Sequence, residues 1–600
     1  MKIQLKTLTP LHIGNGEELH SLDYVVHQRS FYRISQRQFE NFMETSGVKG
    51  IENAFSDWVI ETADEIENLK EEASRTRDKR DKMDFNQKQS QLKKQFNYLS
   101  FAQKQKIDQL FIAFLKKNLV EIPITAPDLA TRKQAVRGLM TTATGLPYLP
   151  GSSLKGAIRT ALMFDVLENK KDKVQIEVLL QKALDATEND IQREGVTKGD
   201  RAADRKREQL KKNFGEALEH AVFYCGNITE KGFAKQDDEK YDLMKLIIIA
   251  DVHTTKQARS LESIDGYLIS KTKDRNDKLI KQAEIQRQTP CIEAITEGVT
   301  FKDVSIEFNI DFLLTLKNTF TTNPKFKKEN WLGIEQKVKH LFDIDFDGLT
   351  SENLAEQKQR TLTHIRQCVQ QFSQRQLDFD KHWLDNFEAF DTRREYSPKL
   401  KQGFATVLNP KGRTFINVGY AAGFGSTTVL FYLLDKHRPE LKRVMSLFGI
   451  GNKPNNKGLY TPAPDNFPKS KRLVSRTNSI QPVGWLEWID GNVVDNNLQI
   501  ASSLAMTNEN SVVQEVKAPF TPTPLRGAVK PGNDVFAQIV SCGKPNKVRL
   551  FIAEEKQPIV DCPYGMGFDA AKKDAWIVVK ITSMRGKTDV GNVGFVKFVD

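Results

Sequence analysis

Apolar and polar residues alternate at the start of the chain, as they do in a strand buried on one face. Ile3 and Leu5 alternate with Lys2, Gln4 and Lys6. A period of two places both apolar side chains on the same side of the strand. The pattern therefore predicts a strand over residues 2–8.

A hairpin and a capped helix are predicted next. The apolar runs 23–27 and 31–34 flank a short polar turn, which is the signature of a β-hairpin. Ser35 and Gln38 have the spacing of a capping box, in which each side chain satisfies an unpaired amide of the other's backbone. Gly47 ends the predicted helix. Strands that lead into a capped helix indicate an α+β fold.

Three long polar stretches interrupt this pattern and are predicted to be helical insertions. Residues 60–118 and 169–215 are rich in interleaved charges of both signs, and 330–390 has a helical pattern. Such composition is typical of solvated helices or helical hairpins. Between them, Val304 to Ile310 alternates again and predicts a second strand buried on one face.

The character changes once more after residue 490. Short β-rich runs alternate there with turns of Gly, Pro and Lys, at 535–540, 548–552, 576–581 and 593–598. Short strands with regular turn signals favour a small separate β domain, for which an OB-like barrel is one form.

Length indicates the number of domains, and charge indicates the class of partner. The chain has 600 residues, more than one hydrophobic core usually organises, so we expect several domains or large insertions. A formal net charge of +12 favours a polyanionic partner, although many soluble basic proteins share such a charge.

The sequence shows no sign of membrane insertion or of a disulfide framework. The first six residues lack the apolar core of a signal peptide, and the densest apolar runs, 246–250 and 429–434, are too short to cross a bilayer. Five scattered cysteines form no C-x-x-C pair. We therefore expect a cytoplasmic protein without a zinc ribbon.

The segment 146–159 is the first candidate for binding chemistry. Pro150 and Gly151 end a loop, and Ser152 or Ser153 can cap a helix whose first turns carry Lys155 and Arg159 on one face. Free amides, the positive end of the helix dipole and two cations make a place for phosphate. A capped surface helix with two solvated cations remains an equal alternative.

The glycine-rich segment 419–428 is the second candidate. Its glycines, among them Gly423 and Gly425, allow close approach of the backbone to a ligand, and Ser426 and Thr427 add hydroxyl groups. No lysine precedes Ser426, so the segment is not a nucleotide-binding P-loop. A purely structural turn explains the pattern equally well.

Histidines give two weaker candidates. His12, followed by Gly14, could act as a general base on a ribose 2′-hydroxyl, but no orienting partner accompanies it, and a structural or RNA-contacting role is favoured. Asp251 and His253 could begin a metal site, but no third ligand follows from the sequence. We therefore predict neither a metal nor a cofactor.

Together these segments resemble the RAMP superfamily of CRISPR-associated proteins, and within it the subunit that caps the 3′ end of crRNA in type III-A Csm complexes. The residues that carry the resemblance are LTPLHIGNGEEL at 8–19, DYV at 23–25, LPGSSLKGAIR at 149–159, EAI at 293–295 with Gly298 and Phe301, the loop 419–428, and PVGW at 482–485.

The resemblance implies a fold of two ferredoxin-like, RRM-related RAMP halves with large helical insertions. We expect an N-terminal half over 1–310, with insertions at about 50–118 and 165–245, and a C-terminal half with helices over 311–490. Residues 491–600 lie beyond the usual end of the family and receive no role from it.

The resemblance also implies function and partners. The expected function is that of a non-catalytic crRNA-binding subunit that caps the guide and supports its maturation. The expected partners are crRNA, the repeating RAMP backbone subunits, the small helical subunit and host nucleases. By position, the RNA-contacting residues are Ser152, Ser153, Lys155, Arg159, Gly423, Gly425, Ser426 and Thr427, with His12 and Gly14 as weaker candidates.

Two other functions stay open. The first is a metal-independent endoribonuclease that processes precursor crRNA through His12. The second is a protein scaffold whose basic character is incidental. For residues 491–600, an RNA-binding barrel with Lys544, Lys547 and Arg549 as contacts and an assembly module with solvated lysines are equally favoured.

Overall fold

The structure is a computed structural model of residues 1–600, in which not every segment is described. The longest undescribed segments are 126–135, 190–217, 227–240, 448–469, 491–533 and 563–575, and shorter ones include 423–427 and 542–545. The chain divides into two units, Met1–Gln499 and Ile500–Asp600, which we describe separately. No helix in the described part is long and apolar enough to span a membrane.

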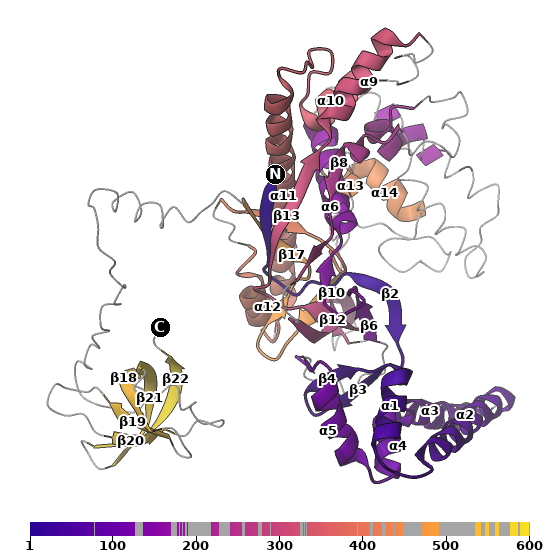
Figure 1. Cartoon of the computed structure of the whole chain (residues 1–600), viewed down its shortest axis with the longest axis vertical. Helices are drawn as coiled ribbons and strands as arrows, with labels where there is room; N and C mark the ends of the chain where they lie inside the picture. Colours follow the sequence, from indigo (N-terminus) through magenta and orange to yellow (C-terminus); the bar gives the residue numbers. More distant parts are fainter. Residues whose placement is uncertain are drawn as a thin grey trace. The chain divides into compact units, whose positions relative to one another are not determined.

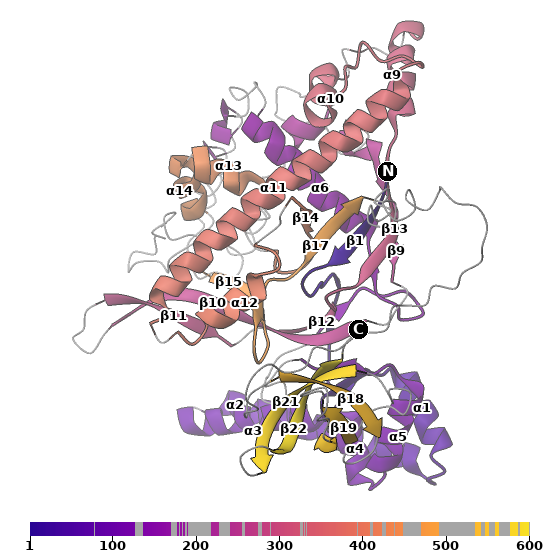
Figure 2. The ribbon, with the colours of Figure 1, turned by 90° about the vertical axis from the view of Figure 1, so that its left-hand side faces the viewer.

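A five-stranded antiparallel sheet forms the centre of the first unit (Figures 1 and 2). Its order is β14-β17-β1-β13-β8, and the strands are β1 (Lys2–Thr7), β8 (Ile247–Ile249), β13 (Thr300–Phe308), β14 (Thr414–Asn417) and β17 (Trp485–Asp490). Ile3 and Leu5 of β1 are buried, which confirms the alternation predicted for the first strand. The predicted strand at 304–310 is also confirmed, with a start four residues earlier.

Two long helices pack against this sheet and against each other. They are α6 (Gly151–Asn169) and α11 (Leu354–Phe390), and α11 runs diagonally across the view of Figure 2. Leu154, Ile158 and Leu162 of α6 are fully buried, because residues four apart lie on one face of a helix. They share one hydrophobic core with Leu5 of β1 and Ile365 of α11, so the core lies between the sheet and the helix pair.

A second, seven-stranded sheet lies in the first unit. Its order is β16-β15-β10-β12-β6-β2, with β11 paired to β10, and its strands are β2 (Gly14–Leu19), β6 (Val136–Leu139), β10 (Arg259–Lys273), β11 (Leu279–Gln286), β12 (Cys291–Ile295), β15 (Ser470–Ser475) and β16 (Ile480–Gln481). Every residue of β12 is buried. This central strand is therefore covered on both faces.

An aromatic-rich lobe near the N-terminus contains the predicted hairpin and helix. The hairpin is β3 (Tyr24–His27) with β4 (Ser30–Arg33), which also pairs with β5 (Ile122–Pro123), and α1 (Gln36–Thr45) follows. Ser35 and Gln38 form both halves of the predicted capping box. The predicted insertion at 50–118 is helical: α2 (Ile51–Arg75), α3 (Lys79–Gln95), α4 (Tyr98–Lys104) and α5 (Asp108–Asn118).

Further helices surround the central layers of the first unit. They are α9 (Ile310–Thr322), α10 (Ile334–Phe342), α12 (Ser397–Phe404), α13 (Thr428–Lys436) and α14 (Arg438–Leu447), with the two-stranded pair β7 (Tyr148–Leu149) and β9 (Val252–His253) beside the start of α6. The boundary predicted at residue 310 falls inside this unit, where β1 pairs with β13 before that residue and β17 after it.

The second unit is an antiparallel five-stranded sheet. Its order is β20-β19-β18-β21-β22, and its strands are β18 (Asp534–Ser541), β19 (Asn546–Leu550), β20 (Ile559–Cys562), β21 (Trp576–Arg585) and β22 (Asp589–Phe598). Four of these strands coincide with the β-rich runs seen in the sequence. The buried residues, such as Ile539, Val548 and Val579, form a core of their own.

Candidate nucleic-acid interface

The start of α6 is closed by an acidic side chain. α6 begins at Gly151, before both serines, so the expectation that Ser152 or Ser153 caps the helix is wrong. Instead, the amide of Gly151 donates a hydrogen bond of 2.8 Å to Oδ1 of Asp251. A carboxylate is a favourable partner at the positive end of a helix. The anion site predicted at this helix end thus already holds an anion from the chain itself.

Glycine is required at this helix start because of close packing. A Cβ atom at Gly151 would lie 2.1 Å from the carbonyl oxygen of Ile249 at the end of β8. Since real Cβ atoms do not approach a backbone oxygen so closely, any larger residue would push α6 away from β8. Gly156, one turn later, is exposed, and a Cβ atom there would meet no atom within 4 Å.

Arg159 is engaged by the protein's own side chains. Its guanidinium lies 2.9 Å from a carboxylate oxygen of Asp242 and 3.0 Å from one of Glu219. It also lies 4.0 Å above the ring of Phe223. Ion pairing and cation–π contact together hold this side chain in place. Arg159 therefore has a clear structural role, and its contact with RNA stays a prediction.

Lys155 is the more available of the two predicted cations. Among the residues that the structure describes, none forms an ion pair with it within 4 Å. Partial burial lowers the pKa of its ammonium group, and the positive charges of Arg159 and Lys245 add to this, while Asp242 opposes it. A half-buried cation close to other cations favours an anionic partner. Lys155 thus keeps the character that the sequence suggested.

Only the first part of the glycine-rich segment is described. Gly423, Gly425, Ser426 and Thr427 lie outside the described residues. The described part begins at Gly419, whose φ of +84° favours glycine and whose Cβ atom would lie 2.4 Å from the carbonyl oxygen of His12. The amide of Tyr420 donates a 2.9 Å hydrogen bond to that same oxygen. The segments around His12 and Tyr420, far apart in the sequence, are therefore in direct contact.

Tyr420 is flanked by two arginines that sequence reasoning did not single out. The guanidinium of Arg137 lies 5.0 Å from the centre of its ring, and Arg472 donates a 2.9 Å hydrogen bond to its hydroxyl. Tyr420 was visible in the sequence as the aromatic residue of the glycine-rich segment. Arg137 and Arg472 lie in β6 and β15 and carry no motif, so only the fold brings them to this ring.

A cavity of about 450 Å³ opens beside Tyr420. Its lining comes from α11, the end of β14, the 419–422 turn, β15, and the start of β17 with the turn before it. It includes Gln376, Phe379, Asp380, Asn417, Tyr420, Ala421, Lys471, Arg472, Pro482 and Trp485. Aromatic rings next to guanidinium groups are the usual means of holding an unpaired base and its phosphate. We call Arg137, Tyr420 and Arg472, with this cavity, the tyrosine cluster.

The two predicted segments come close to each other through their neighbours. A small cavity of about 30 Å³ is lined by Ala157 and Thr160 of α6 and by Ile416 and Asn417 at the end of β14. Asn417 also lines the cavity of the tyrosine cluster. α6 thus lies close to the end of β14, the strand that leads into the glycine-rich segment.

His12 lies beneath the tyrosine cluster as a buried, neutral group. It is 1% exposed, and its Nδ1 lies 2.6 Å from the carbonyl oxygen of Glu293. The pKa of its imidazole is lowered to about 4, mainly by burial; the Glu293 hydrogen bond opposes this lowering and the nearby charge of Arg137 adds to it. Its ring meets that of Tyr420 edge-on, with centroids 5.6 Å apart. This position supports the tyrosine cluster and gives the imidazole no open access to an RNA hydroxyl.

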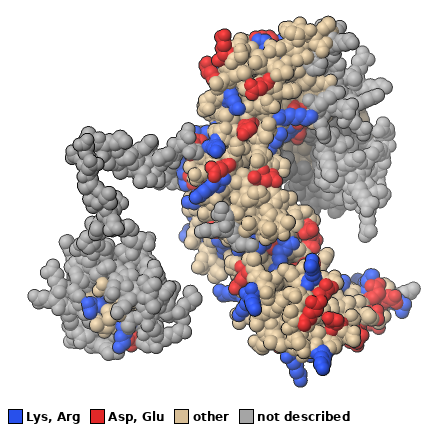
Figure 3. All heavy atoms as spheres, in the orientation of Figure 1, with Lys and Arg blue, Asp and Glu red and all other residues tan. Residues whose placement is uncertain are grey.

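Gly14 is the neighbour that makes room for this histidine. A Cβ atom at Gly14 would lie 3.0 Å from Nε2 of His12, so a larger residue would displace the imidazole. Figure 3 shows Lys and Arg together with Asp and Glu on the described part of one face of the protein.

The chain is similar to proteins of one known family. The sequence profile of the RAMP superfamily matches residues 4–455. The protein "CRISPR system Cms protein Csm5" of Streptococcus thermophilus is 28% identical over 165 residues, which is 27% of this chain and 37% of that relative. The chain thus spans well under half the length of this relative.

Two solved structures are also similar. A chain of the "Csm-crRNA-target RNA ternary complex in type III-A CRISPR-Cas system" is 17% identical with a TM-score of 0.46. The matched region covers 81% of this chain and 100% of that chain. The crystal structure of T. onnurineus Csm5 is 16% identical with a TM-score of 0.44, and covers 80% and 99%.

Proposed function

Because this chain belongs to the RAMP superfamily, we propose that it is a crRNA-binding structural subunit of a type III CRISPR effector complex. In this role it caps the 3′ end of the guide and supports its maturation and the assembly of the complex. Its partners are crRNA, the RAMP backbone subunits, the small helical subunit and host nucleases. The relative named Csm5 supports this assignment.

The tyrosine cluster is the observation that carries RNA binding. A partly buried ring, two guanidinium groups against it and an adjoining cavity can hold a splayed base and the phosphate beside it. Stacking accepts every base, and guanidinium contacts to phosphate are independent of sequence. A subunit that serves many guides needs this kind of recognition. Lys155, Ser152, Ser153 and the 423–427 turn extend the proposed contact surface.

A ferredoxin-like core is the finer fold that we propose. The strand order β17-β1-β13-β8, with α6 between β1 and β8 and α11 between β13 and β17, matches the β-α-β-β-α-β arrangement of ferredoxin-like and RRM folds. The second RAMP half expected over 311–490 stays a prediction.

We propose that this subunit does not itself cleave RNA. The burial and low pKa of His12 weaken the endoribonuclease alternative, since a general base must reach the proton it removes. Incubation of the purified protein with precursor crRNA in EDTA tests this. Site-specific cuts that disappear in His12→Ala would establish the nuclease and contradict the proposal.

For the second unit we propose an OB-like, RNA-binding barrel. The order β20-β19-β18-β21-β22, in which the first strand pairs with both the second and the fourth, supports the OB assignment. Lys547 and Arg549 are exposed on β19, the second strand, where OB folds bind nucleic acid. Lys544 lies outside the described residues. A loss of RNA affinity in the double variant Lys547→Ala with Arg549→Ala would support RNA binding by this unit. Unchanged RNA affinity would favour an assembly module.

Purification of the chain with its neighbours tests the main proposal. We expect a bound small RNA of guide sequence that elutes at lower salt when Tyr420→Ala is combined with Arg472→Ala. Arg37→Ala, an exposed arginine on α1, is the matched control and should leave RNA retention unchanged. A complex that assembles without RNA would show that the chain is a protein scaffold.

A further inference from the structure

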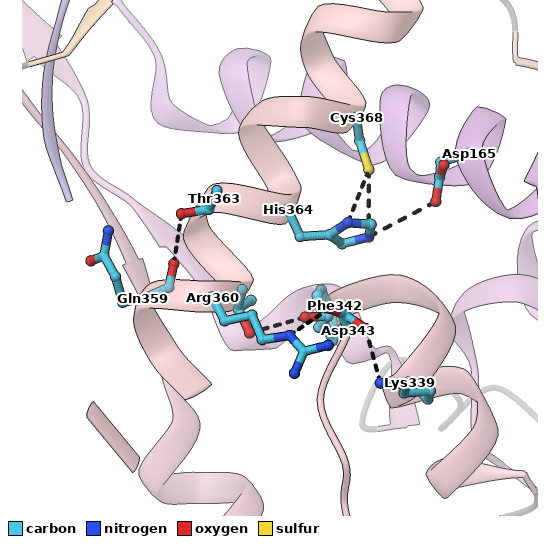
Figure 4. A network of polar contacts seen from close by, with 10 residues as sticks. Asp165, Lys339, Phe342, Asp343, Gln359, Arg360, Thr363, His364 and Cys368 are labelled. Carbon is cyan, nitrogen blue, oxygen red and sulfur yellow. Dashed lines mark hydrogen bonds and ion pairs between the residues drawn. The ribbon is translucent and has the colours of Figure 1, made fainter. Parts of the chain in front are cut away.

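A buried group of three side chains lies between α6 and α11, apart from the proposed RNA interface. His364 and Cys368 are four residues apart on α11 and therefore share one face of the helix. Asp165 faces them from α6, and Figure 4 shows the three side chains pointing toward one another. One ligand atom of each lies within 4.8 Å of the others. We propose that this Asp165–His364–Cys368 cluster binds a zinc ion.

The three ligand atoms are close enough to share one ion after side-chain rotation. Nε2 of His364 lies 3.5 Å from Sγ of Cys368 and 3.9 Å from Oδ2 of Asp165. Zinc binds nitrogen at about 2.0 Å and sulfur at about 2.3 Å, so tetrahedral geometry separates these two atoms by roughly 3.5 Å. Nδ1 of His364 lies 3.9 Å from the same sulfur, so the sulfur lies beside the ring, and the imidazole must rotate to direct Nε2 at an ion between the three groups. The carboxylate must also move about 0.6 Å toward Nε2.

The donor set selects the metal. A thiolate, an imidazole and a carboxylate suit zinc, whereas magnesium and calcium take oxygen ligands. On binding, the thiol of Cys368 loses its proton to the solvent and the imidazole of His364 binds through its neutral nitrogen. Three protein ligands leave the fourth position for a water molecule.

The surroundings orient the ligands and exclude most solvent. Asn169 donates a 2.6 Å hydrogen bond to Oδ1 of Asp165, which leaves Oδ2 facing His364. Such contacts to a ligand fix its orientation and raise metal affinity. Asp165 and Cys368 are 5% and 2% exposed, whereas the side chain of His364 is 15% exposed. An ion therefore has a route of entry at the histidine and a dry environment behind it.

The site would join the two helices that cover the central sheet. Asp165 lies on the same helix as Lys155 and Arg159, and α11 lines the cavity of the tyrosine cluster through Gln376 and Phe379. Since an ion held by both helices binds only the folded arrangement, it stabilises that arrangement by mass action. The ion is thus structural, and RNA binding does not require its chemistry.

Metal analysis of the full-length protein tests the site directly. We expect ~1 zinc per chain by mass spectrometry after dialysis against zinc-free buffer, and a lower Tm after removal with a chelator. Cys368→Ser and His364→Ala should each weaken zinc binding by at least about 100-fold. Cys562→Ser in the second unit and His382→Ala, an exposed histidine on α11, are matched controls that should retain the metal.

Cobalt substitution keeps the test valid if a variant is unstable. Co²⁺ added to the metal-free wild-type protein should give a thiolate-to-cobalt absorption band, which is retained in Cys562→Ser and lost in Cys368→Ser. Folded wild-type protein that binds neither zinc nor cobalt would overturn the proposal and leave a polar contact between Asp165 and His364. Equal zinc content in Cys368→Ser and the wild type would overturn it as well.

Discussion

Arg159 and Arg472 are both basic residues at candidate RNA sites, but their surroundings differ. Arg159 is held by two carboxylates and the ring of Phe223. Arg472 is exposed, and its guanidinium donates to the hydroxyl of Tyr420 beside a cavity. The first arrangement satisfies the cation within the protein, whereas the second leaves its charge facing solvent. A cation in a family motif can therefore serve the fold, while one outside every motif lies beside the cavity of the tyrosine cluster.

The largest expected effect concerns the support of the tyrosine cluster by His12. The folded pKa of its imidazole is about 4, below the ordinary 6.5, so the unfolded chain takes up a proton first as pH falls. The contribution of His12 to the free energy of unfolding is therefore fully present above about pH 6.5. It falls by about 3 kcal/mol as the pH is lowered to 4. Urea unfolding across this range should show the loss in the wild type and a smaller one in His12→Gln. Parallel curves would show that His12 is not a buried neutral group.

Arg159→Ala should give the next largest effect, and on stability more than on RNA affinity. Removal of the guanidinium leaves Asp242 and Glu219 without their partner and uncovers Phe223, at a cost of about 2 kcal/mol in the free energy of unfolding. Urea denaturation measures this, with Arg37→Ala as the control. A stable Arg159→Ala variant with strongly reduced RNA affinity would reverse the comparison.

Tyr420→Leu should affect RNA affinity and leave stability nearly unchanged. Loss of one stacking surface costs about 1.5 kcal/mol, or roughly tenfold in Kd. Fluorescence anisotropy with single-stranded RNA of two unrelated sequences measures the effect, which should be equal for both. Tyr420→Phe keeps the ring and is expected to bind within about twofold of the wild type. Equal losses in both variants would indicate that the hydroxyl, not the ring, makes the contact.

Lys155→Ala should give the smallest effect, visible mainly in the salt dependence. Loss of one phosphate contact lowers the slope of log Kd against log salt concentration by about 1. Lys302→Ala, an exposed lysine on β13, is the control and should keep the wild-type slope. An unchanged slope in Lys155→Ala would confine RNA contact to the tyrosine cluster.

Local patterns predicted the elements well, because short-range chemistry determines them. The strand at β1, the hairpin β3–β4 and the capping box of Ser35 and Gln38 all follow from neighbouring residues. The start of α6 was predicted less well, because its cap, Asp251, comes from a distant segment. Local sequence thus predicts where helices and strands form better than what closes their ends.

The site could be predicted only in part, because its contacts join residues far apart in the chain. The carboxylates that engage Arg159 and the guanidinium groups that flank Tyr420 lie in other elements. The Asp165–His364–Cys368 cluster combines two helices in the same way. A single sequence contains no spacing rule that pairs such residues.

The position of β1 at the centre of its sheet has a consequence for synthesis of the protein. Its partner on one side, β13, ends at residue 308, and its partner on the other, β17, ends at residue 490. At about 5–20 residues per second, a ribosome needs roughly 25–100 s to produce β17. During that time the first strand has an unpaired edge, which is a site for aggregation. Chaperone binding to the exposed edge of β1 is therefore expected until β17 has been synthesised.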